Sequence, residues 1–404
     1  MTLAAGTHYL AIPGPSVVPD AVLRAMHRKA PNIYTGELHE VVDSLIPDLC
    51  AIARTRHNVA IYIANGHGAW EAALANTCAR GDTILCAASG IFGHGWSDMA
   101  EAMGVSVERM DFGKRAPVDA ARLEERLTAD TEHQIRAVMC VQVDTSTSVK
   151  NDIALLRAAI DRAGHPALLM VDCIACLACD PFEMDAWGVD VMVTGSQKGL
   201  MTPPGLGFVF FNDKADAARD RATCLTRYWD WRPRVEAEHF YQYFCGTAPT
   251  HHLYGLRKAV DLIQAEGLEQ VWARHERLAQ AIWAAIEAWG AEGPLALNIQ
   301  EPGLRSWAVT ALRIGAPHGT ALRNWVSENA GVTLGIGLGM ATEDDPNSDG
   351  FFRIGHMGHV NAQMVMGALG SIAAAMAALD IPHGKGGLEA AAAILGGKGL
   401  GGKG

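Results

Sequence analysis

Apolar and polar positions alternate between two periods along residues 59–211. Short, nearly continuous apolar runs predict buried strands, and apolar residues spaced three and four apart between them predict helices. Strands are expected at 59–64, 83–87, 105–110, 137–143, 167–171, 189–194 and 207–211, and helices at 22–26, 38–53, 69–78, 96–103, 120–127 and 153–163. This alternation predicts βαβ units, and therefore an α/β fold with a mostly parallel sheet covered by helices.

The pattern changes after residue 211. Residues 212–250 are irregular and aromatic, and a long helix expected at about 252–266 ends at Gly267, a residue type that commonly stops helices. Helices at 269–289 and 361–379, with strand-like runs at 308–314, 332–334 and 350–355, predict a second, smaller α/β unit. We expect an irregular N-terminal arm (1–20), a large domain (21–265), a small C-terminal domain (266–383) and a Gly-, Lys- and Ala-rich tail (384–404).

The composition narrows the class of protein. The formal net charge is −11 and the basic residues form no stripe, so a nucleic-acid partner is not expected. The N-terminus lacks a basic segment followed by an apolar stretch, and no window approaches the roughly 18 uninterrupted apolar residues of a membrane span. Nine cysteines without a regular framework are typical of a reducing compartment. We therefore expect a cytoplasmic globular protein.

Two ionisable residues follow successive predicted strands. Lys198 lies in Val-Thr-Gly-Ser-Gln-Lys-Gly (193–199), where a lysine is poorly placed for solvation and well placed to form an imine with a carbonyl compound. Asp172 ends the apolar run 167–171, and strand ends of open α/β sheets face the ligand crevice. Alternatively, Lys198 is an exposed loop lysine and Asp172 caps the next helix.

Two further features suggest binding of anions. Asn-Gly-His-Gly-Ala (65–69) joins a predicted strand to a predicted helix, and its small residues let backbone N–H groups approach a phosphate. A plain glycine-rich turn is the alternative. Arg353 stands inside an apolar run, and its guanidinium fork suits a carboxylate, with a structural ion pair as the alternative. The segment 397–404 mimics a phosphate-binding loop but lacks its Ser or Thr, and we interpret it as a peripheral tail.

Cys173, Cys176 and Cys179 have a C-x2-C-x2-C spacing, which can hold an iron–sulfur cluster. Asp180 and Pro181 follow where a fourth ligand would be sought. The run also directly follows a core strand, where free cysteines pack well. A metal-binding protein is therefore a remote alternative, and we expect no metal site.

Together these segments resemble the class V aminotransferases of fold type I, which use pyridoxal 5'-phosphate (PLP). The likeness is greatest to the group that transfers amino groups from alanine, serine or aspartate to glyoxylate. It runs from the segment Pro-Gly-Pro-Ser (13–16) to Arg-Ile-Gly (353–355), and its most specific part is 171–205. The resemblance implies a large domain with a mostly parallel seven-stranded-type sheet and a smaller C-terminal α/β domain.

The resemblance also implies a role for each candidate residue. Lys198 would form the imine with PLP and Asp172 would keep the pyridine nitrogen protonated. The implied cofactor contacts are Gly66, His67, Gly68 and Gln197 at the phosphate, Thr145 and Phe92 at the ring, and Thr247 from a neighbouring subunit. Arg353 would bind the substrate carboxylate, and Gly14 is included in the substrate site.

The activity implied is transfer of an amino group from serine, alanine or aspartate to glyoxylate, giving glycine, by a ping-pong mechanism through an aldimine. Aspartate would need a second cation, for which Arg227, Arg232 and Arg234 are candidates. Sharing of Thr247 implies a homodimer. The alternatives are a pyridoxamine–pyruvate-type aminotransferase, which the segment 353–358 and the tail also resemble, and another class V PLP enzyme, a lyase or desulfurase.

Two departures from close relatives accompany this resemblance. Asn-Ile-Tyr (32–34) stands where they often carry a His-Arg pair, and Phe244 stands where they have a tyrosine. Phe244 lacks the hydroxyl that a tyrosine would place near the phosphate.

Overall fold

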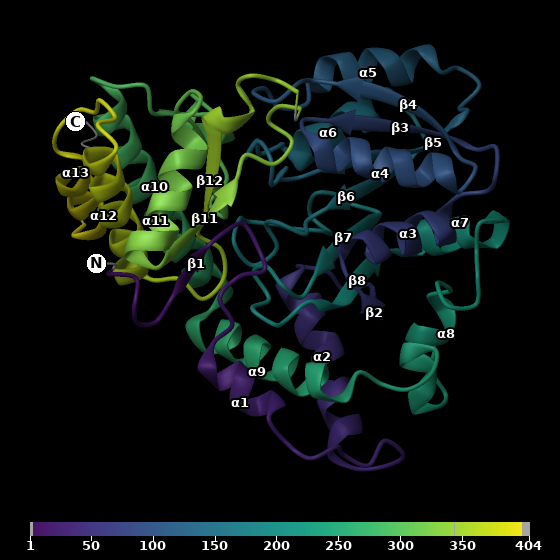
Figure 1. Ribbon diagram of the computed structural model, residues 1–404. Helices are drawn as coiled ribbons and strands as arrows, with labels where there is room; N and C mark the ends of the chain where they lie inside the picture. Colours follow the sequence, from purple (N-terminus) through teal and green to yellow (C-terminus); the bar gives the residue numbers. More distant parts are fainter. Residues whose placement is uncertain (1–2, 343, 398–404) are drawn as a thin grey trace.

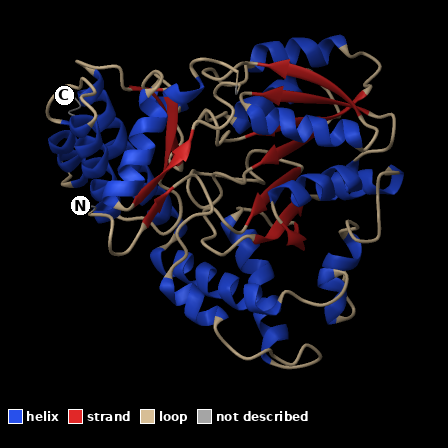
Figure 2. Ribbon diagram, viewed as in Figure 1, coloured by secondary structure: helices blue, strands red, loops and turns tan. Residues whose placement is uncertain are grey.

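The computed structural model describes residues 3–342 and 344–397 and contains two β-sheets, each with its own helices (Figure 1). The larger unit is built on a seven-stranded sheet and the smaller on a five-stranded sheet. Figure 2 shows loops that join strands to helices gathered between the two units. Loops positioned in this way by rigid strands and helices are common sites of binding and catalysis.

The larger sheet has the strand order β2-β8-β7-β6-β5-β3-β4, and only β8 runs antiparallel to its neighbours. Its strands are β2 (Asn58–Ala64), β3 (Thr83–Ala88), β4 (Ser106–Asp111), β5 (Ile135–Val141), β6 (Leu168–Asp172), β7 (Val191–Gly195) and β8 (Gly205–Phe211). The mostly parallel α/β sheet expected from the apolar runs is confirmed.

Alternate residues of the central strands enter two cores on opposite faces of this sheet. In β5, Val138 and Cys140 join one core, and Ala137 and Met139 join the other. The first core is covered by α2 (Glu37–Ile52), α5 (Ala120–Ala129), α6 (Ile153–Arg162) and α9 (Thr250–Glu266), and the second by α3 (Gly66–Thr77), α4 (Ile91–Ala102) and α7 (Asp213–Ala218). Because successive strand residues face opposite sides, strands buried on both faces are apolar throughout.

The smaller sheet has the order β1-β11-β12-β10-β9. Its strands are β1 (Tyr9–Ala11), β9 (Ala296–Leu297), β10 (Val309–Arg313), β11 (Val332–Ile336) and β12 (Phe351–Gly355), and its helices are α10 (Leu268–Gly290), α11 (His318–Ala330), α12 (Ala362–Ala378) and α13 (Gly387–Leu395). Apolar side chains of these strands and helices form a third core.

Two terminal segments differ from the sequence expectation. The arm expected to be irregular contains β1, which pairs in parallel with β11 and places Tyr9 opposite Val332. The tail expected after the small domain (384–404) contains α13, whose Ala391 and Ile394 are buried in the third core. A three-residue strand is too short to show a period, and α13 is built of small residues that gave no apolar stripe. The phosphate-loop mimic lies almost wholly outside the described residues.

Two segments of chain connect the units. Gly267 lies between α9 and α10 with a φ of 87°, in the left-handed region that favours glycine. After β1, residues 12–19 leave the smaller sheet and lead to α1 (Asp20–Met26), which packs along α9 of the larger unit (Figure 1). The stretch 212–250, expected to be irregular, contains the helices α7 and α8 (Arg232–Val235) and 3-10 turns at Arg219–Arg221 and Phe240–Phe244.

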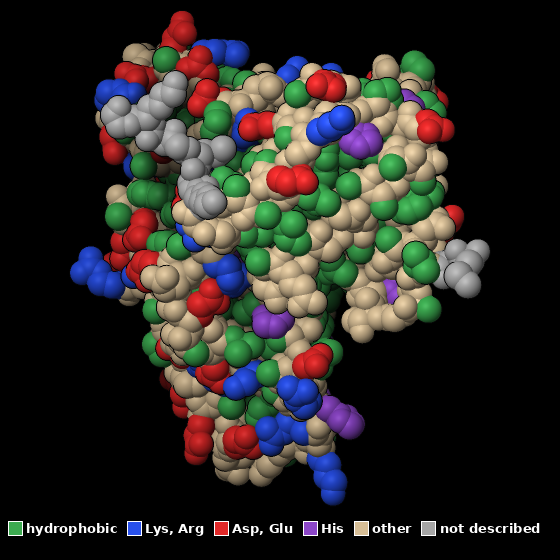
Figure 3. Space-filling view, turned by 90° about the vertical axis from the view of Figure 1, so that its left-hand side faces the viewer, with side chains coloured by type: hydrophobic (Ala, Val, Ile, Leu, Met, Phe, Trp, Pro, Cys, Tyr) green, Lys and Arg blue, Asp and Glu red, His purple; other side chains and the backbone are tan. Residues whose placement is uncertain are grey.

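The surface mixes both signs of charge. Figure 3 shows acidic and basic side chains interspersed over the face on the side of the smaller unit. Many ion pairs involve exposed partners, such as Arg24 with Asp20, and pairs of this kind contribute little to stability. Within residues 3–342 and 344–397, no helix combines the length and apolar character needed to cross a membrane.

Candidate active site

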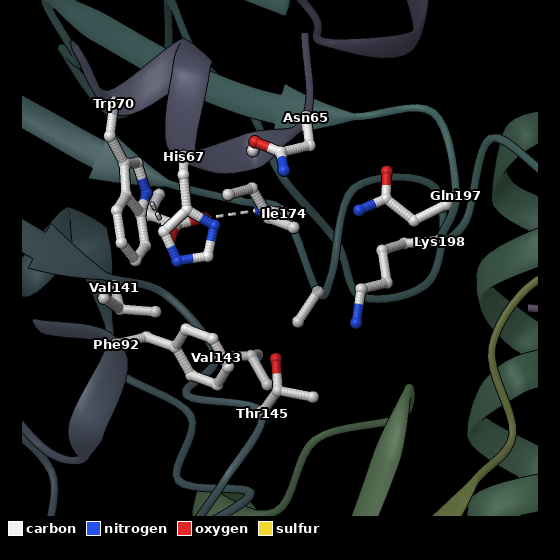
Figure 4. A pocket seen from close by; sticks show the side chains of 13 residues that line it. Asn65, His67, Trp70, Phe92, Val141, Val143, Thr145, Ile174, Gln197 and Lys198 are labelled. Carbon is white, nitrogen blue, oxygen red and sulfur yellow. Dashed lines mark hydrogen bonds between the residues drawn. The ribbon is translucent and has the colours of Figure 1, made fainter. Parts of the chain in front are cut away.

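A cavity of about 240 Å³ lies at the carboxyl ends of β2, β5, β6 and β7. It is lined by Asn65, Gly66, His67, Trp70, Phe92, Val141, Val143, Thr145, Asp172, Ile174, Ala175, Gln197 and Lys198. Figure 4 shows His67 and Phe92 across the open space from Lys198. The structure thus brings seven residues predicted for the site into one crevice, where an open α/β sheet is expected to bind ligands. They are Gly66, His67, Phe92, Thr145, Asp172, Gln197 and Lys198.

Lys198 presents its amine to this cavity. The amine donates a hydrogen bond to the Pro13 carbonyl, and the Lys198 carbonyl accepts one from Ser16 Oγ at 2.8 Å. Burial, and secondarily the charge of Arg353, lowers the pKa of the amine to about 8, while Asp172 acts in the opposite direction. A lowered pKa leaves more of the amine unprotonated and nucleophilic near neutral pH. The side chain is therefore placed for imine chemistry.

Gly14 lies against the Lys198 amine. It has a φ of +95°, and a Cβ built on it would stand 2.5 Å from Lys198 Nζ. A residue with a Cβ would be strained at this φ and would force the lysine side chain to shift. Gly14 does not line the cavity. Its contact with the predicted site is with the Lys198 side chain.

Asp172 ends β6, and each of its carboxylate oxygens accepts a hydrogen bond. Oδ1 accepts from the Ile174 backbone N–H at 2.6 Å, and Oδ2 accepts from the Trp70 indole N–H at 2.9 Å. Burial raises the pKa of Asp172 to about 7, and these two hydrogen bonds oppose that effect. Residues 174–179 form turns and no helix, so the helix cap considered as the alternative is not formed, and the carboxyl lines the cavity. A cation placed beside it would favour its ionised form.

The N-terminus of α3 forms one end of the cavity. Asn65 caps the helix by accepting a hydrogen bond from the Gly68 N–H at 3.2 Å. In the described part of the chain, no hydrogen bond is recorded for the backbone N–H groups of Gly66 and His67. Free N–H groups at the start of a twelve-residue helix, together with the helix dipole, favour a phosphate there.

Two glycines of this turn lie close to neighbouring side chains. A Cβ on Gly66 would lie 2.4 Å from Ile174 Cδ1, and one on Gly68 would lie 2.6 Å from the Ala64 Cβ. Gly68 is therefore a packing position behind the helix end and does not line the cavity.

The other residues predicted to contact the cofactor ring and phosphate, Gln197, Thr145 and Phe92, lie on different walls of the cavity. Gln197 Oε1 is buried and has no hydrogen-bond partner among the described residues, which leaves it available to a ligand. Thr145 lines the cavity with its side chain, and its carbonyl accepts a hydrogen bond from Arg353 at 2.8 Å. Phe92 stands at the start of α4, where its N–H donates to Asp144 at 3.0 Å. A planar ring entering the cavity would meet the Phe92 side chain.

Arg353 lies next to the cavity and does not line it. Its Nε donates to the Ile336 carbonyl at 2.7 Å and its Nη1 to the Thr145 carbonyl at 2.8 Å. Burial lowers the pKa of the guanidinium to about 10, opposed by Asp144. Within the described ranges Arg353 makes no salt bridge of the kind considered as the alternative. The guanidinium is thus anchored by backbone carbonyls with its charge uncompensated by a paired carboxylate.

Thr247 lies outside the cavity of its own chain. It is exposed between Gly246 and Ala248, which line a separate groove with Tyr34 and Tyr241. Its predicted contact with the cofactor therefore requires a second subunit.

The arginines considered for a second substrate carboxylate differ in their surroundings. Arg232 pairs with Asp216 at 3.0 Å and with Asp220 at 2.5 Å. Arg234 is buried and donates to backbone carbonyls, including that of Ile61 at 2.9 Å. Both are therefore committed to structure, and the cavity lining contains neither of them nor Arg227.

The thiols of the cysteine run are buried beneath the site. Cys173 and Cys176 both contact Gln142 Oε1, at 3.3 and 3.1 Å. Among the described residues, no group of three or more His, Cys, Asp or Glu side chains is arranged to hold a metal ion. Burial raises the pKa of these thiols, so they pack as neutral groups.

Sequence reasoning missed several residues that line the cavity. Trp70, Ile174 and Ala175 belong to this group. In the sequence Trp70 resembles any core residue of a buried helix. Its hydrogen bond to Asp172 is what sets it apart, and that bond is visible only in the structure. The one available signal was its position one turn after the glycine turn.

Comparison with known proteins places this site in a family. Residues 8–335 match the family Aminotransferase class-V. The chain is 37% identical over 384 residues to the L-aspartate–glyoxylate aminotransferase of Paracoccus denitrificans (strain Pd 1222), with 92% of this chain and 91% of that protein covered. It is 38% identical over 372 residues to a serine–glyoxylate aminotransferase of Methylorubrum extorquens, with 90% of each chain covered.

Solved structures agree with this match. A ureidoglycine–glyoxylate aminotransferase from Bacillus subtilis superimposes with a TM-score of 0.86 at 22% identity, covering 97% of this chain and 99% of that one. A pyridoxamine–pyruvate aminotransferase from Mesorhizobium loti gives a TM-score of 0.85 at 24% identity, covering 98% and 99%. These likenesses show the fold-type I architecture. With the family match over residues 8–335, they establish that the chain belongs to the class V aminotransferases.

Proposed function

We propose that this enzyme is a PLP-dependent aminotransferase that moves an amino group from a small amino acid to glyoxylate, giving glycine. The observation that carries the proposal is the pairing of Lys198 and Asp172 in one cavity whose end is the N-terminus of α3. An imine-forming amine, an acid for a ring nitrogen and an anion site are the three groups that PLP requires. The names of the relatives support glyoxylate as the acceptor.

The residues present fit PLP. The uncommitted N–H groups of Gly66 and His67 suit the phosphate end, where the Gln197 amide can donate through Nε2, and Asp172 suits the ring nitrogen. Phe92 and Thr145 supply the walls beside the ring. When bound, the cofactor supplies an electron sink for the α-carbon of an amino acid.

The chain's own groups perform three tasks around that sink. Lys198, whose amine has a lowered pKa, would accept the proton of the substrate α-carbon at Nζ and hold it beside the cofactor. Arg353, held by two carbonyls, orients the substrate carboxylate and hence the bond to be broken. Asp172 keeps a positive charge on the ring nitrogen. Val141, Val143 and Ile174 supply apolar surface to the cavity wall.

The cavity favours a donor with a small side chain. Among its lining residues only Lys198 and His67 carry basic groups. Serine and alanine need no further cation. Aspartate needs one for its side-chain carboxylate, and Lys198 and His67 are already assigned to the cofactor in this proposal. In our proposal, such a cation and Thr247 come from the second subunit of a homodimer with shared active sites. Nine free cysteines support a cytoplasmic location.

The test is a half-reaction with the PLP-loaded enzyme. Serine, alanine and aspartate are each added without a keto acid, and loss of the cofactor's visible band reports conversion to the amino form. Glyoxylate should restore the band and yield glycine, and Lys198→Ala serves as the inactive control. No spectral change with any of these donors would overturn the proposal. Conversion with free pyridoxamine and pyruvate would instead support the alternative aminotransferase.

A further inference from the structure

Trp70 makes the side-chain hydrogen bond to Asp172. Its indole N–H donates to Oδ2 at 2.9 Å, and the contact is fully buried. The other recorded donor is the backbone N–H of Ile174, at 2.6 Å to Oδ1. Among the described residues Trp70 is thus the one side chain that donates to this carboxylate. Hydrogen bonds to charged groups are about twice as strong as neutral ones.

An aromatic stack holds the Trp70 ring in place. It stacks on Trp96 with ring centroids 5.9 Å apart and an angle of 14°, and it meets the edge of Phe92 at 6.3 Å and 68°. His67 lies on another side, with centroids 4.5 Å apart. These three neighbouring rings hold the Trp70 ring in the orientation in which its indole N–H donates to Asp172. Figure 4 shows Trp70 and His67 together at this end of the cavity.

We propose that Trp70 is a positioning residue for Asp172, which fixes Oδ2 and stabilises the ionised carboxylate so that it faces the cofactor ring nitrogen. This inference deepens the proposed function and rests on it for the identity of the ring. The carboxylate retains unused lone pairs on both oxygens, so the two recorded donors do not exclude the ring nitrogen.

The electrostatic surroundings show why such a donor matters. Burial raises the pKa of Asp172 to about 7, and Asp144 from the loop after β5 acts in the same direction. Lys198 opposes them, as does the Trp70 hydrogen bond. The neighbouring thiols of Cys140 and Cys173 stay neutral because burial raises their pKa. His67 on α3 is the remaining titratable group beside the Trp70 ring.

The first experiment is an infrared titration of the cofactor-free protein. The protonated-carboxyl band of Asp172 is isolated by subtracting the spectrum of Asp172→Asn. Trp70→Phe should move the titration midpoint upward by about one to two pH units, the size expected for loss of one hydrogen bond to a charged group. Trp96→Phe is the matched control, because it alters the same stack and its buried indole N–H has no partner among the described residues. Its midpoint should remain that of the unaltered protein.

The second experiment uses enzyme loaded with PLP labelled with nitrogen-15 in the ring. The ring nitrogen signal should move toward that of neutral pyridine in Trp70→Phe and stay unchanged in Trp96→Phe. If Trp70→Phe does not fold, Trp70→Leu removes the same donor and must show the same shift. An unshifted infrared midpoint in the folded variant, or equal shifts in the Trp96 control, would overturn the inference. Because the infrared titration needs no cofactor, a failure to bind PLP would count against the proposed function alone.

Discussion

At the scale of single residues, the position of the Lys198 amine depends on how closely the backbone at Pro13 and Gly14 approaches it. Lys198 and Asp172 could be predicted because charged residues directly after apolar runs have few structural explanations. Trp70 could not, because a tryptophan in a buried helix is ordinary and its hydrogen bond depends on packing between α3 and β6. Gly14 could be named from the resemblance, and its geometric reason, the contact with the lysine amine, required the structure.

This approach gives a prediction for Gly14→Ala. The new methyl group would stand 2.5 Å from Lys198 Nζ, so we expect imine formation with PLP to slow at least about tenfold, as expected for reacting groups moved from their required geometry. Gly36→Ala is the matched control, because Gly36 has the same φ of +95° and nothing within 4 Å of the added Cβ. The rate of growth of the imine absorbance measures both. Slowing of the same size in both variants would show that backbone strain, and not contact with the amine, governs the effect.

At the scale of elements, the alternation of strands and helices was predictable because most of them bury a continuous run or a clear stripe. The short β1 and the small-residue helix α13 were not, since both depend on partners far away in the sequence. The helix α3 shows how an element contributes to a site. Its cap, Asn65, both closes the helix end and lines the cavity, so one side chain serves stability and binding.

Substitution of Asn65 should separate these two roles. Asn65→Ala removes the cap and should lower the free energy of unfolding by about 1 kcal/mol. Asn65→Asp keeps a capping oxygen, so its stability should be near that of the unaltered protein, while its charge should weaken binding of a phosphate-bearing cofactor. Denaturant unfolding and PLP titration measure the two effects. A loss of affinity that only follows the loss of stability would contradict a phosphate site at this helix end.

At the scale of the whole molecule, buried carboxyl groups of the larger unit make the stability of the cofactor-free protein depend on pH. The pKa of Asp172 is raised by burial to about 7, and burial also raises that of Asp180. An unfolded aspartate titrates near 3.9. Between these two pH values the folded Asp172 carboxyl holds a proton that the unfolded chain has released. The contribution of Asp172 to the free energy of unfolding is therefore fully present below about pH 4 and is lost as pH rises through about 7.

The corresponding prediction concerns Asp172→Asn. Cofactor-free protein should lose stability between about pH 4 and 7, and the variant should lose less, by up to about 4 kcal/mol for a shift of three pKa units. Denaturant unfolding at a series of pH values gives the comparison, with Asp180 present in both proteins. Parallel curves for the two proteins would show that Asp172 does not titrate in this range.

The N-terminal arm has a consequence for the order in which the site is completed during synthesis. β1 pairs with β11, so the arm that carries Pro13, Gly14 and Ser16 to Lys198 is anchored by residues synthesised more than 300 positions later. Contacts of such long sequence separation form late, because loop closure must precede them. A nascent chain can therefore build the larger sheet with Asp172 and Lys198 in place while the arm is still unanchored. The lysine gains its final neighbours only after Val332–Leu334 have been synthesised.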